Sequence, residues 1–320
     1  MPWTAADIPD QTGRHVVVTG ANSGLGWWTS LAVARAGARV TMAVRDEAKG
    51  ADALARIDAA LTGVPGRGQV AVRWLDLADL ASVAAFAEEV GADPVDVLVN
   101  NAGVMAIPRR TTADGFEMQL GTNRLGHVAL TLRLLPALVR AGRDGDSDAR
   151  VVTVSSNAHR FGRIAFDDLM GERRYSPWTA YGQSKLANLL FALELQRRLA
   201  GAGLPVASYA AHPGYAATEL QGVAPRMRGS GLGERFATIG NRVLAQSAEM
   251  GALPQLYAAT EPGLLAGSYV GPNGFLEQRG HPKVTSATAA AYDPQAAARL
   301  WEASEELVGV RWADALASVG

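Results

Sequence analysis

A tyrosine and a lysine, Tyr181 and Lys185, stand four residues apart in the stretch Tyr-Gly-Gln-Ser-Lys. On a helix this spacing places both side chains on one face, one turn apart. Free tyrosine has a pKa near ~10, which is too high for easy two-way proton transfer at neutral pH. A neighbouring ammonium stabilises the phenolate and lowers that pKa, so that the phenol can give a proton to a developing alkoxide. In the company of the segments below, the pair predicts chemistry that moves a proton together with a hydride.

Far upstream, a strand-like run ends in a glycine-rich turn, Thr19-Gly20-Ala21-Asn22-Ser23-Gly24-Leu25-Gly26. Gly20 permits a tight turn, Gly24 lets the backbone approach a ligand closely, and Gly26 lets the helix pack on the strand. The free N–H groups at the start of the following helix, together with its dipole, favour a pyrophosphate. The turn therefore predicts a dinucleotide site, with contacts from Gly20, Asn22, Ser23, Gly24, Leu25 and Gly26.

The second strand-like run ends at Val44, and Arg45 and Asp46 follow it. In NAD-binding proteins an acidic residue about twenty residues beyond the glycines bonds the ribose hydroxyls. Val44 stands where that acid is expected, whereas a guanidinium at Arg45 can bind the ribose phosphate of NADP. We therefore predict NADP(H) as the cofactor in preference to NAD. The alternative is that Arg45 is solvated and Asp46 binds the ribose.

Short β-branched runs alternate with alanine-rich helical stretches. The strand candidates are His15–Thr19, Arg39–Val44, Val70–Leu75, Val95–Asn100, Val151–Ser155, Val206–Ala211 and Ser268–Val270. The helix candidates are Leu31–Ala36, Ala51–Ala60, Ser82–Val90, Phe116–Arg140 and Thr179–Leu199. Near-continuous apolar strands indicate burial on both faces, and their alternation with helices indicates right-handed crossovers. We predict a single α/β domain over residues 1–320, a Rossmann-type doubly wound parallel sheet with helices on both faces.

Two regions differ from this alternation. Residues 215–250 include a stretch of glycine, arginine and methionine with weak periodicity, Gly222–Gly240, and are predicted to be a flap over the site. Residues 293–320 are predicted to be a helical extension. Asp293-Pro294 is a typical helix start, and an apolar stripe follows it, at Leu300, Trp301, Ser304, Leu307 and Val308.

Composition limits the classes of function. The chain has 320 residues, 48% of them hydrophobic, and a formal net charge of −1, so no overall charge attracts nucleic acid. The absence of cysteine excludes disulfides and thiolate metal sites, and the histidines show no metal-ligand pairing, so we expect no metal. No secretory signal or membrane-spanning stretch is apparent. We therefore expect a cytoplasmic protein with a small-molecule partner; the sequence leaves homo-oligomerisation open.

With these segments in view, the chain resembles the short-chain dehydrogenase/reductase family from about Asp10 to Trp312. Four residues match the family's catalytic tetrad, namely Asn123, Ser156, Tyr181 and Lys185. The resemblance implies that Tyr181 is the general acid or base and that the Ser156 hydroxyl bonds the carbonyl oxygen. It also implies that Lys185 holds the nicotinamide ribose and that Asn123 holds a water joining Lys185 to solvent.

Further segments match the family's cofactor contacts. Asp76-Leu77 resembles the pair along the adenine, Asn101-Ala102-Gly103 the segment behind the adenine ribose, and Pro213-Gly214 with Thr218 the segment against the nicotinamide. Ser155-Ser156-Asn157-Ala158-His159 and His212-Pro213-Gly214 are similar to the retinol-dehydrogenase-like and WW-domain-oxidoreductase-like branch. Residues that flank these segments are candidate walls of an apolar substrate pocket, namely Phe161, Trp178, Tyr215 and Met227.

Three functions fit these motifs to different degrees. An NADP-dependent alcohol dehydrogenase or carbonyl reductase uses every motif. A redox-sensing regulator that binds NADP without turnover could lose the tyrosine or the lysine, but all four tetrad positions are filled. Reduction of a ring double bond, as in the related light-dependent protochlorophyllide reductases, would be expected to use a cysteine donor, and the chain has none. The tryptophans Trp27 and Trp28 beside the glycine turn have no assigned role.

Overall fold

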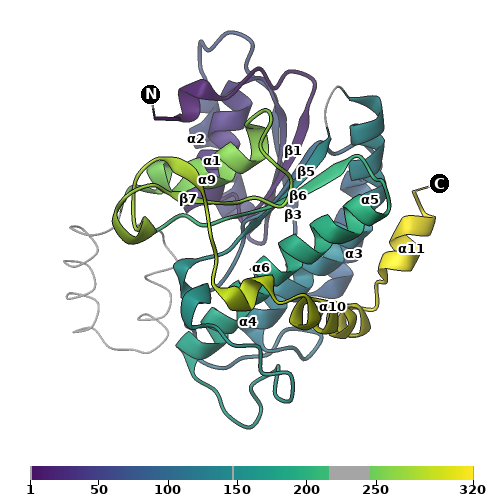
Figure 1. Ribbon diagram of the computed structural model, residues 1–320. Helices are drawn as coiled ribbons and strands as arrows, with labels where there is room; N and C mark the ends of the chain where they lie inside the picture. The colour runs from purple at the N-terminus through teal and green to yellow at the C-terminus, as the bar shows by residue number, and fades with distance from the viewer. Residues whose placement is uncertain (1, 146–147, 216–245, 320) are drawn as a thin grey trace.

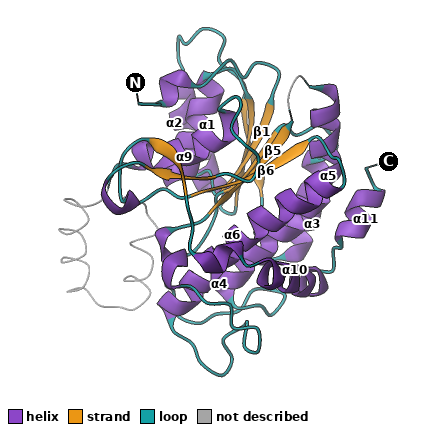
Figure 2. Cartoon of the chain, viewed as in Figure 1, coloured by secondary structure: helices purple, strands orange, loops and turns teal. Residues whose placement is uncertain are grey.

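A computed structural model describes residues 2–145, 148–215 and 246–319. Its centre is one eight-stranded sheet in the order β3-β2-β1-β4-β5-β6-β7-β8 (Figures 1 and 2). The first seven strands pair in parallel, and the last pairs antiparallel with β7. Their bounds are β1 His15–Thr19, β2 Arg39–Val44, β3 Val70–Trp74, β4 Val97–Asn100, β5 Ala149–Val154, β6 Val206–Ala211, β7 Tyr269–Pro272 and β8 Pro282–Thr285.

Helices cover both faces of the sheet. One face carries α1 Gly24–Arg35, α2 Glu47–Ala60 and α9 Ala248–Thr260. The other carries α3 Leu80–Val90, α5 Gly126–Asp144 and α6 Pro177–Gly201. Two C-terminal helices, α10 Pro294–Val308 and α11 Trp312–Ala317, pack outside α6 and α5 (Figure 1). The predicted doubly wound fold is thereby confirmed.

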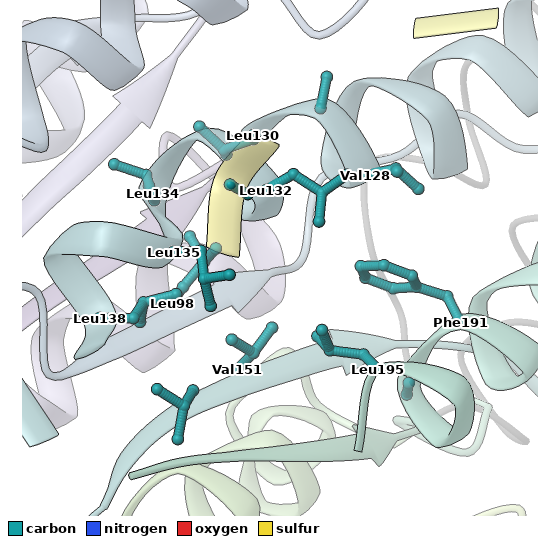
Figure 3. Packing of buried hydrophobic residues seen from close by; sticks show 14 of the residues in the cluster. Leu98, Val128, Leu130, Leu132, Leu134, Leu135, Leu138, Val151, Phe191 and Leu195 are labelled. Carbon is teal, nitrogen blue, oxygen red and sulfur yellow. The ribbon is translucent and has the colours of Figure 1, made fainter. Parts of the chain in front are cut away.

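The burial of the apolar strands explains the layering. β1 is buried along its whole length, and two hydrophobic clusters lie on opposite sides of the sheet. In the larger cluster, Leu98 of β4 lies beside Leu135 and Leu138 of α5, and Val151 of β5 lies beside Leu195 of α6 (Figure 3). Full burial of such a side chain is worth roughly 1.5–3 kcal/mol. These contacts pack α5 and α6 on the strands that lead to the candidate site.

Two elements of the structure were not predicted from the sequence pattern. The antiparallel strand β8, Pro282–Thr285, was missed because it is a half-exposed edge strand without a buried apolar run. Helix α9 was missed because it is apolar on all sides and contains Pro254. It packs both on the sheet and against α1, so most of its surface is buried and it lacks the polar stripe of a surface helix.

The long helix predicted over Phe116–Arg140 is interrupted. A short helix α4, Met118–Leu120, is followed by a π-helical turn, Gly121–Leu125, before α5 begins. A π turn inserts an extra residue into the helical repeat and is frequent at functional sites. Here the turn contains Asn123, one of the candidate catalytic residues.

The C-terminal region contains the helices α10 and α11. The Asp293 carboxylate caps α10 by accepting hydrogen bonds from the Gln295 and Ala296 N–H groups, 2.9 and 3.0 Å long. The helix ends at Gly309, which has the left-handed φ of 65° that a glycine cap supplies. The predicted flap, residues 215–250, lies mostly outside the described residues. Within the described ranges, no helix is both long and apolar enough to cross a membrane.

Candidate active site

The candidate residues gather at the carboxyl edge of the sheet. The glycine turn follows β1, Asn101 follows β4, Ser156 follows β5, and His212 follows β6. Because β1 pairs with β2 on one side and β4 on the other, the strand order reverses at β1. In open α/β sheets, the crevice beyond this reversal is where ligands bind.

Close backbone packing shapes the glycine turn. A Cβ on Gly20, whose φ is 66°, would lie 3.0 Å from the Ala102 Cα. A Cβ on Gly26 would lie 2.5 Å from the Gly20 carbonyl oxygen. Ser23 precedes α1, and its side chain makes no capping hydrogen bond. The first N–H groups of α1 are therefore available to an anionic ligand.

A buried hydrogen-bond chain joins this turn to the π turn. The carbonyl oxygen of Asn123 lies 3.1 Å from His127 Nδ1, so Nδ1 carries the proton. Burial lowers the pKa of His127 to about 4, so Nε2 is unprotonated and accepts from the Thr19 hydroxyl at 2.9 Å. Thr19 Oγ1 in turn accepts from the N–H groups of Asn101 and Ala102, at 2.9 and 3.0 Å. Sequence reasoning missed this role for His127; the one available signal was its spacing, four residues after Asn123.

The Asn123 side chain braces the segment after β4. Its amide nitrogen donates to the Val104 carbonyl and the Ser184 hydroxyl, both at 2.9 Å, and its oxygen accepts from the Val104 N–H at 2.7 Å. Both amide hydrogens of Asn123 are thus bonded within the protein. Only an oxygen atom of Asn123 is left to bind the water that the family resemblance implies. A Cβ on Gly103 would lie 2.9 Å from Asn123 Oδ1 and 3.6 Å from Lys185 Nζ. Glycine at this position lets the β4 segment approach both tetrad residues.

Three tetrad side chains meet at the end of β5. Tyr181 and Lys185 are both buried on α6, with the Lys185 ammonium 5.8 Å from the centre of the Tyr181 ring. Lys185 Nζ donates to the Val154 carbonyl at 3.1 Å. The Tyr181 hydroxyl is hydrogen-bonded to the side chain of Ser156. Ser156 Oγ also accepts from the Ala158 N–H at 3.2 Å, which fixes the direction of its hydroxyl.

The protonation of the pair differs from the expectation. Burial raises the pKa of Tyr181 to about 12, although the hydrogen bond to Ser156 opposes this rise. Burial also lowers the pKa of Lys185 to about 8. The predicted lowering of the tyrosine pKa by Lys185 is therefore absent in the protein alone, because burial disfavours the charged phenolate. At neutral pH, Tyr181 is a protonated, proton-donating group.

Arg45 and Asp46, the two candidate ribose ligands after β2, differ in the contacts that they make. Asp46 caps α2, accepting from the Lys49 N–H at 3.1 Å and pairing with the Lys49 ammonium at 3.2 Å. These hydrogen bonds lower the pKa of the Asp46 carboxyl. Arg45 is exposed, and its side chain has no ion pair or hydrogen bond with any described residue. The carboxylate is thus occupied by its helix, while the guanidinium is available.

The remaining cofactor segments lie at the same edge. Asp76 caps the turn after β3 by accepting from the Ala78 N–H at 2.9 Å, and Leu77 is buried beside Gly126 at the start of α5. Pro213 accepts from the Gln246 amide at 2.6 Å, and Gly214 has a left-handed φ of 65°. Two expected residues, Thr218 and Met227, fall outside the described residues.

Trp27 and Trp28, which had no assigned role in the sequence, make packing contacts in the structure. Trp27 donates through Nε1 to the Ala53 carbonyl at 3.0 Å, lies under the Arg56 guanidinium and contacts Trp28 edge-on. It therefore anchors α1 on α2. In the described part of the chain, no group of His, Asp and Glu side chains is arranged to hold a metal ion.

Comparison with known proteins agrees with this geometry. Residues 14–228 match the family model described as short chain dehydrogenase. Human retinol dehydrogenase 12 is 42% identical over 304 residues, 94% of this chain and 88% of the relative. Mouse polyprenol dehydrogenase is 42% identical over 311 residues, 96% of this chain and 87% of the relative.

Two solved structures extend the comparison. An uncharacterised protein of Mycobacterium paratuberculosis is 46% identical with a TM-score of 0.78, over 98% of this chain and 99% of that one. A Beutenbergia cavernae protein, assigned as an NAD(P)-dependent gluconate 5-dehydrogenase and solved with NADP, is 29% identical with a TM-score of 0.59, over 81% of this chain and 94% of that one.

The fold, the edge at which the motifs meet and the family match define the class: the chain belongs to the short-chain dehydrogenase family of oxidoreductases. Within that family it falls in the retinol-dehydrogenase-like branch, since its relatives there are about 40% identical over nearly the whole chain.

Proposed function

We propose that this protein is an NADP(H)-dependent oxidoreductase that interconverts an apolar primary alcohol and its aldehyde. The convergence of Ser156, Tyr181 and Lys185 at the carboxyl edge carries the proposal. The site fits a dinucleotide, because Gly20 and Gly26 leave a cradle that a Cβ would fill and α1 presents N–H groups without a side-chain cap. The bound nicotinamide would supply or accept the hydride.

The protein's own residues handle the proton. Ser156, whose hydroxyl is directed by the Ala158 N–H, orients the substrate carbonyl. Tyr181, protonated at neutral pH, donates its proton as negative charge develops on that oxygen. Lys185 supplies positive charge beside the phenol and is the group that would hold the nicotinamide ribose. Oxidation of the alcohol uses the same residues in reverse, with the phenolate as base.

Arg45 favours NADP over NAD. Its guanidinium is exposed at the end of β2, while the rival ribose ligand Asp46 is engaged as the cap of α2. A free guanidinium matches a phosphate, and a carboxylate already bonded to its helix is a poor partner for ribose hydroxyls. The relative solved with NADP supports the same choice.

The apolar substrate class is supported by two observations. The relatives at 42% identity are named for retinol and polyprenol, both long apolar alcohols. Aromatic side chains also surround Tyr181: Trp178 contacts its ring edge-on at 6.2 Å and is 51% exposed, and Phe161 packs against Gly182 and is 55% exposed. Exposed aromatics beside a reactive phenol suit the chain of an apolar alcohol.

The test is turnover of purified protein with NADPH against a panel of aldehydes, from short polar ones to long isoprenoid ones, with Tyr181→Phe as the control. We expect the rate to rise with apolar chain length. Tyr181→Phe should keep NADPH binding and lose roughly 10²–10⁴-fold in kcat, the usual contribution of a general acid. If the wild type binds NADPH but turns over no aldehyde, the result would instead favour a redox-sensing regulator. If Tyr181→Phe retains more than about a tenth of the wild-type rate, Tyr181 is not the main acid.

A further inference from the structure

A strained loop after β7 lies against the candidate site. In this loop, residues 273–281, Leu276 and Glu277 both have left-handed backbones, with φ of 50° and 56°. Such a conformation costs about 1–3 kcal/mol for a residue that is not glycine, and it persists only where surrounding contacts hold it. Leu276 is 69% exposed, so burial of its side chain does not hold the loop. The contacts that do so converge on Glu277.

The Glu277 carboxylate is bound from three directions. Arg160 donates to Oε2 at 3.0 Å, and Thr285 of β8 donates to Oε1. His212, fully buried at the end of β6, places Nε2 3.4 Å from Oε2. Its other nitrogen, Nδ1, accepts from the Gly214 N–H at 3.2 Å, so Nε2 carries the proton and faces the carboxylate. Together these partners hold the pKa of Glu277 at about 2, and it is ionised at any working pH.

Two of these partners belong to different parts of the site. Arg160 lies in the 3₁₀ turn Asn157–Phe161, which Ser156 caps through its side chain. His212 leads into Pro213-Gly214, the segment expected against the nicotinamide. The same carboxylate is thus hydrogen-bonded to the turn that directs the Ser156 hydroxyl, and it contacts the histidine at the strand end that leads into Pro213-Gly214.

The backbone of the loop reinforces these links. Tyr215 donates its N–H to the Gln278 carbonyl at 2.7 Å, and the Asn157 amide lies 3.4 Å from the Glu277 carbonyl. A side chain on Gly214 would collide with the Gln278 carbonyl. The loop therefore packs directly on the Pro213-Gly214 segment.

We propose that Glu277 is a positioning residue for the reaction, whose carboxylate sets the Ser156 turn and the Pro213-Gly214 segment relative to each other. The inference rests on the proposed function, since it assumes that these two segments orient substrate and nicotinamide. Glu277 touches neither reacting group. Its effect is transmitted through Arg160 and His212.

The test is Glu277→Gln, which keeps the size of the side chain and removes its charge. Cofactor-binding sites are counted by quenching of tryptophan fluorescence with NADPH, and kcat per site is measured with an aldehyde that the wild type reduces. Because a misplacement of about 1 Å can cost on the order of a hundredfold, we expect kcat to fall ten- to a hundredfold and KM for NADPH to rise. The deuterium isotope effect with NADPH labelled at the transferred position should also increase, because hydride transfer becomes slower than product release.

Glu89→Gln is the matched control. It removes an exposed ion pair with Arg73, 2.5 Å long, on the sheet edge remote from Ser156, and it should leave kcat and the isotope effect unchanged. A Glu277→Gln protein with unchanged kcat per site and isotope effect, and with only a lower melting temperature, would overturn the proposal.

Two milder variants cover the case in which Glu277→Gln does not fold. Arg160→Met and Thr285→Val each remove one partner of the carboxylate, and each should lower kcat in the same direction by a smaller factor. Unchanged kcat in both would refute the positioning role. If the wild type turned over no aldehyde, the proposed function would fail separately. The effect of Glu277→Gln on NADPH affinity would then decide the inference, with unchanged affinity refuting it.

Discussion

At the scale of single residues, burial determines the pKa values of two titratable residues in the candidate site. Tyr181 and Lys185 are both shifted toward their neutral forms, because burial removes the hydration that each charged form would have in water. A neutral phenol is ready to donate a proton, which suits reduction of a carbonyl at neutral pH. Oxidation of an alcohol requires the phenolate, which the protein alone disfavours.

This asymmetry predicts opposite pH dependences for the two directions. Since the pKa of Tyr181 is raised to about 12, kcat/KM for alcohol oxidation should rise steadily with pH toward alkaline values. Reduction should be level near neutral pH and decline as Lys185, with a pKa lowered to about 8, loses its charge. The measurement is kcat/KM in both directions from about pH 6 to pH 10. A reduction rate that keeps rising above pH 8 would contradict the assigned roles.

Arg45 supports a second prediction at this scale. A hydrogen bond to a charged group is worth roughly 1.5–3 kcal/mol, and about 1.4 kcal/mol is tenfold in affinity. Arg45→Ala should therefore lower kcat/KM for NADPH by about ten- to a hundredfold and leave NADH nearly unaffected, since NADH lacks the phosphate. The comparison is the ratio of kcat/KM for the two coenzymes. An unchanged ratio would mean that the phosphate is held elsewhere, as by Asn22 and Ser23, or that the wild type prefers NADH.

At the scale of elements, the caps at strand and helix ends determine where side chains converge. The capping of α10 by Asp293 is one instance that can be measured apart from catalysis, because α10 packs on the outer side of α6. Asp293→Ala should lower the free energy of unfolding by about 1 kcal/mol, within the ~0.5–2 kcal/mol typical of a lost cap. Urea denaturation measures this change. A loss of kcat per folded enzyme in the same variant would contradict a purely structural role.

The sequence was sufficient for elements whose pattern is local. The bounds of β1, β2 and β6 were predicted correctly because buried parallel strands are continuous apolar runs between turn signals. Strand β8 escaped prediction because it is a half-exposed edge strand without a buried apolar run, and helix α9 because it is buried on nearly all sides and so lacks a polar stripe.

The candidate site, too, has features that the sequence predicts and features that only the folded chain shows. The order of motifs along the chain grouped Ser156, Tyr181 and Lys185 in one candidate site, and the structure brings these three residues together at the end of β5. Contacts that depend on the folded chain, such as the link from His127 to Thr19 and the three partners of Glu277, leave no pattern in the sequence. The pKa values of the buried pair likewise follow from desolvation, which residue spacing does not report.

At the scale of the whole molecule, the C-terminal helices complete the core behind α6, the helix that carries Tyr181 and Lys185. Trp301 of α10 is 1% exposed, stacks on Phe191 of α6 at 5.7 Å, and lies 4.4 Å from the Arg198 guanidinium. Trp301→Ala should lower the free energy of unfolding by about 3–5 kcal/mol, the usual cost of a buried tryptophan cavity. Chemical denaturation followed by circular dichroism measures it, and a loss below about 1 kcal/mol would show that α10 is dispensable to the core.

The position of Trp301 has a consequence for biosynthesis. Phe191 is made more than a hundred residues earlier, so on the ribosome the outer side of α6 stays uncovered until α10 has emerged. During that interval the nascent chain carries a nearly complete sheet with an exposed apolar helix face, the kind of surface on which chaperones act and through which chains aggregate. Folding therefore cannot finish until the last tenth of the chain has been synthesised. A chain that ends before α10, because the ribosome stalls or the messenger RNA is truncated, would be prone to aggregate.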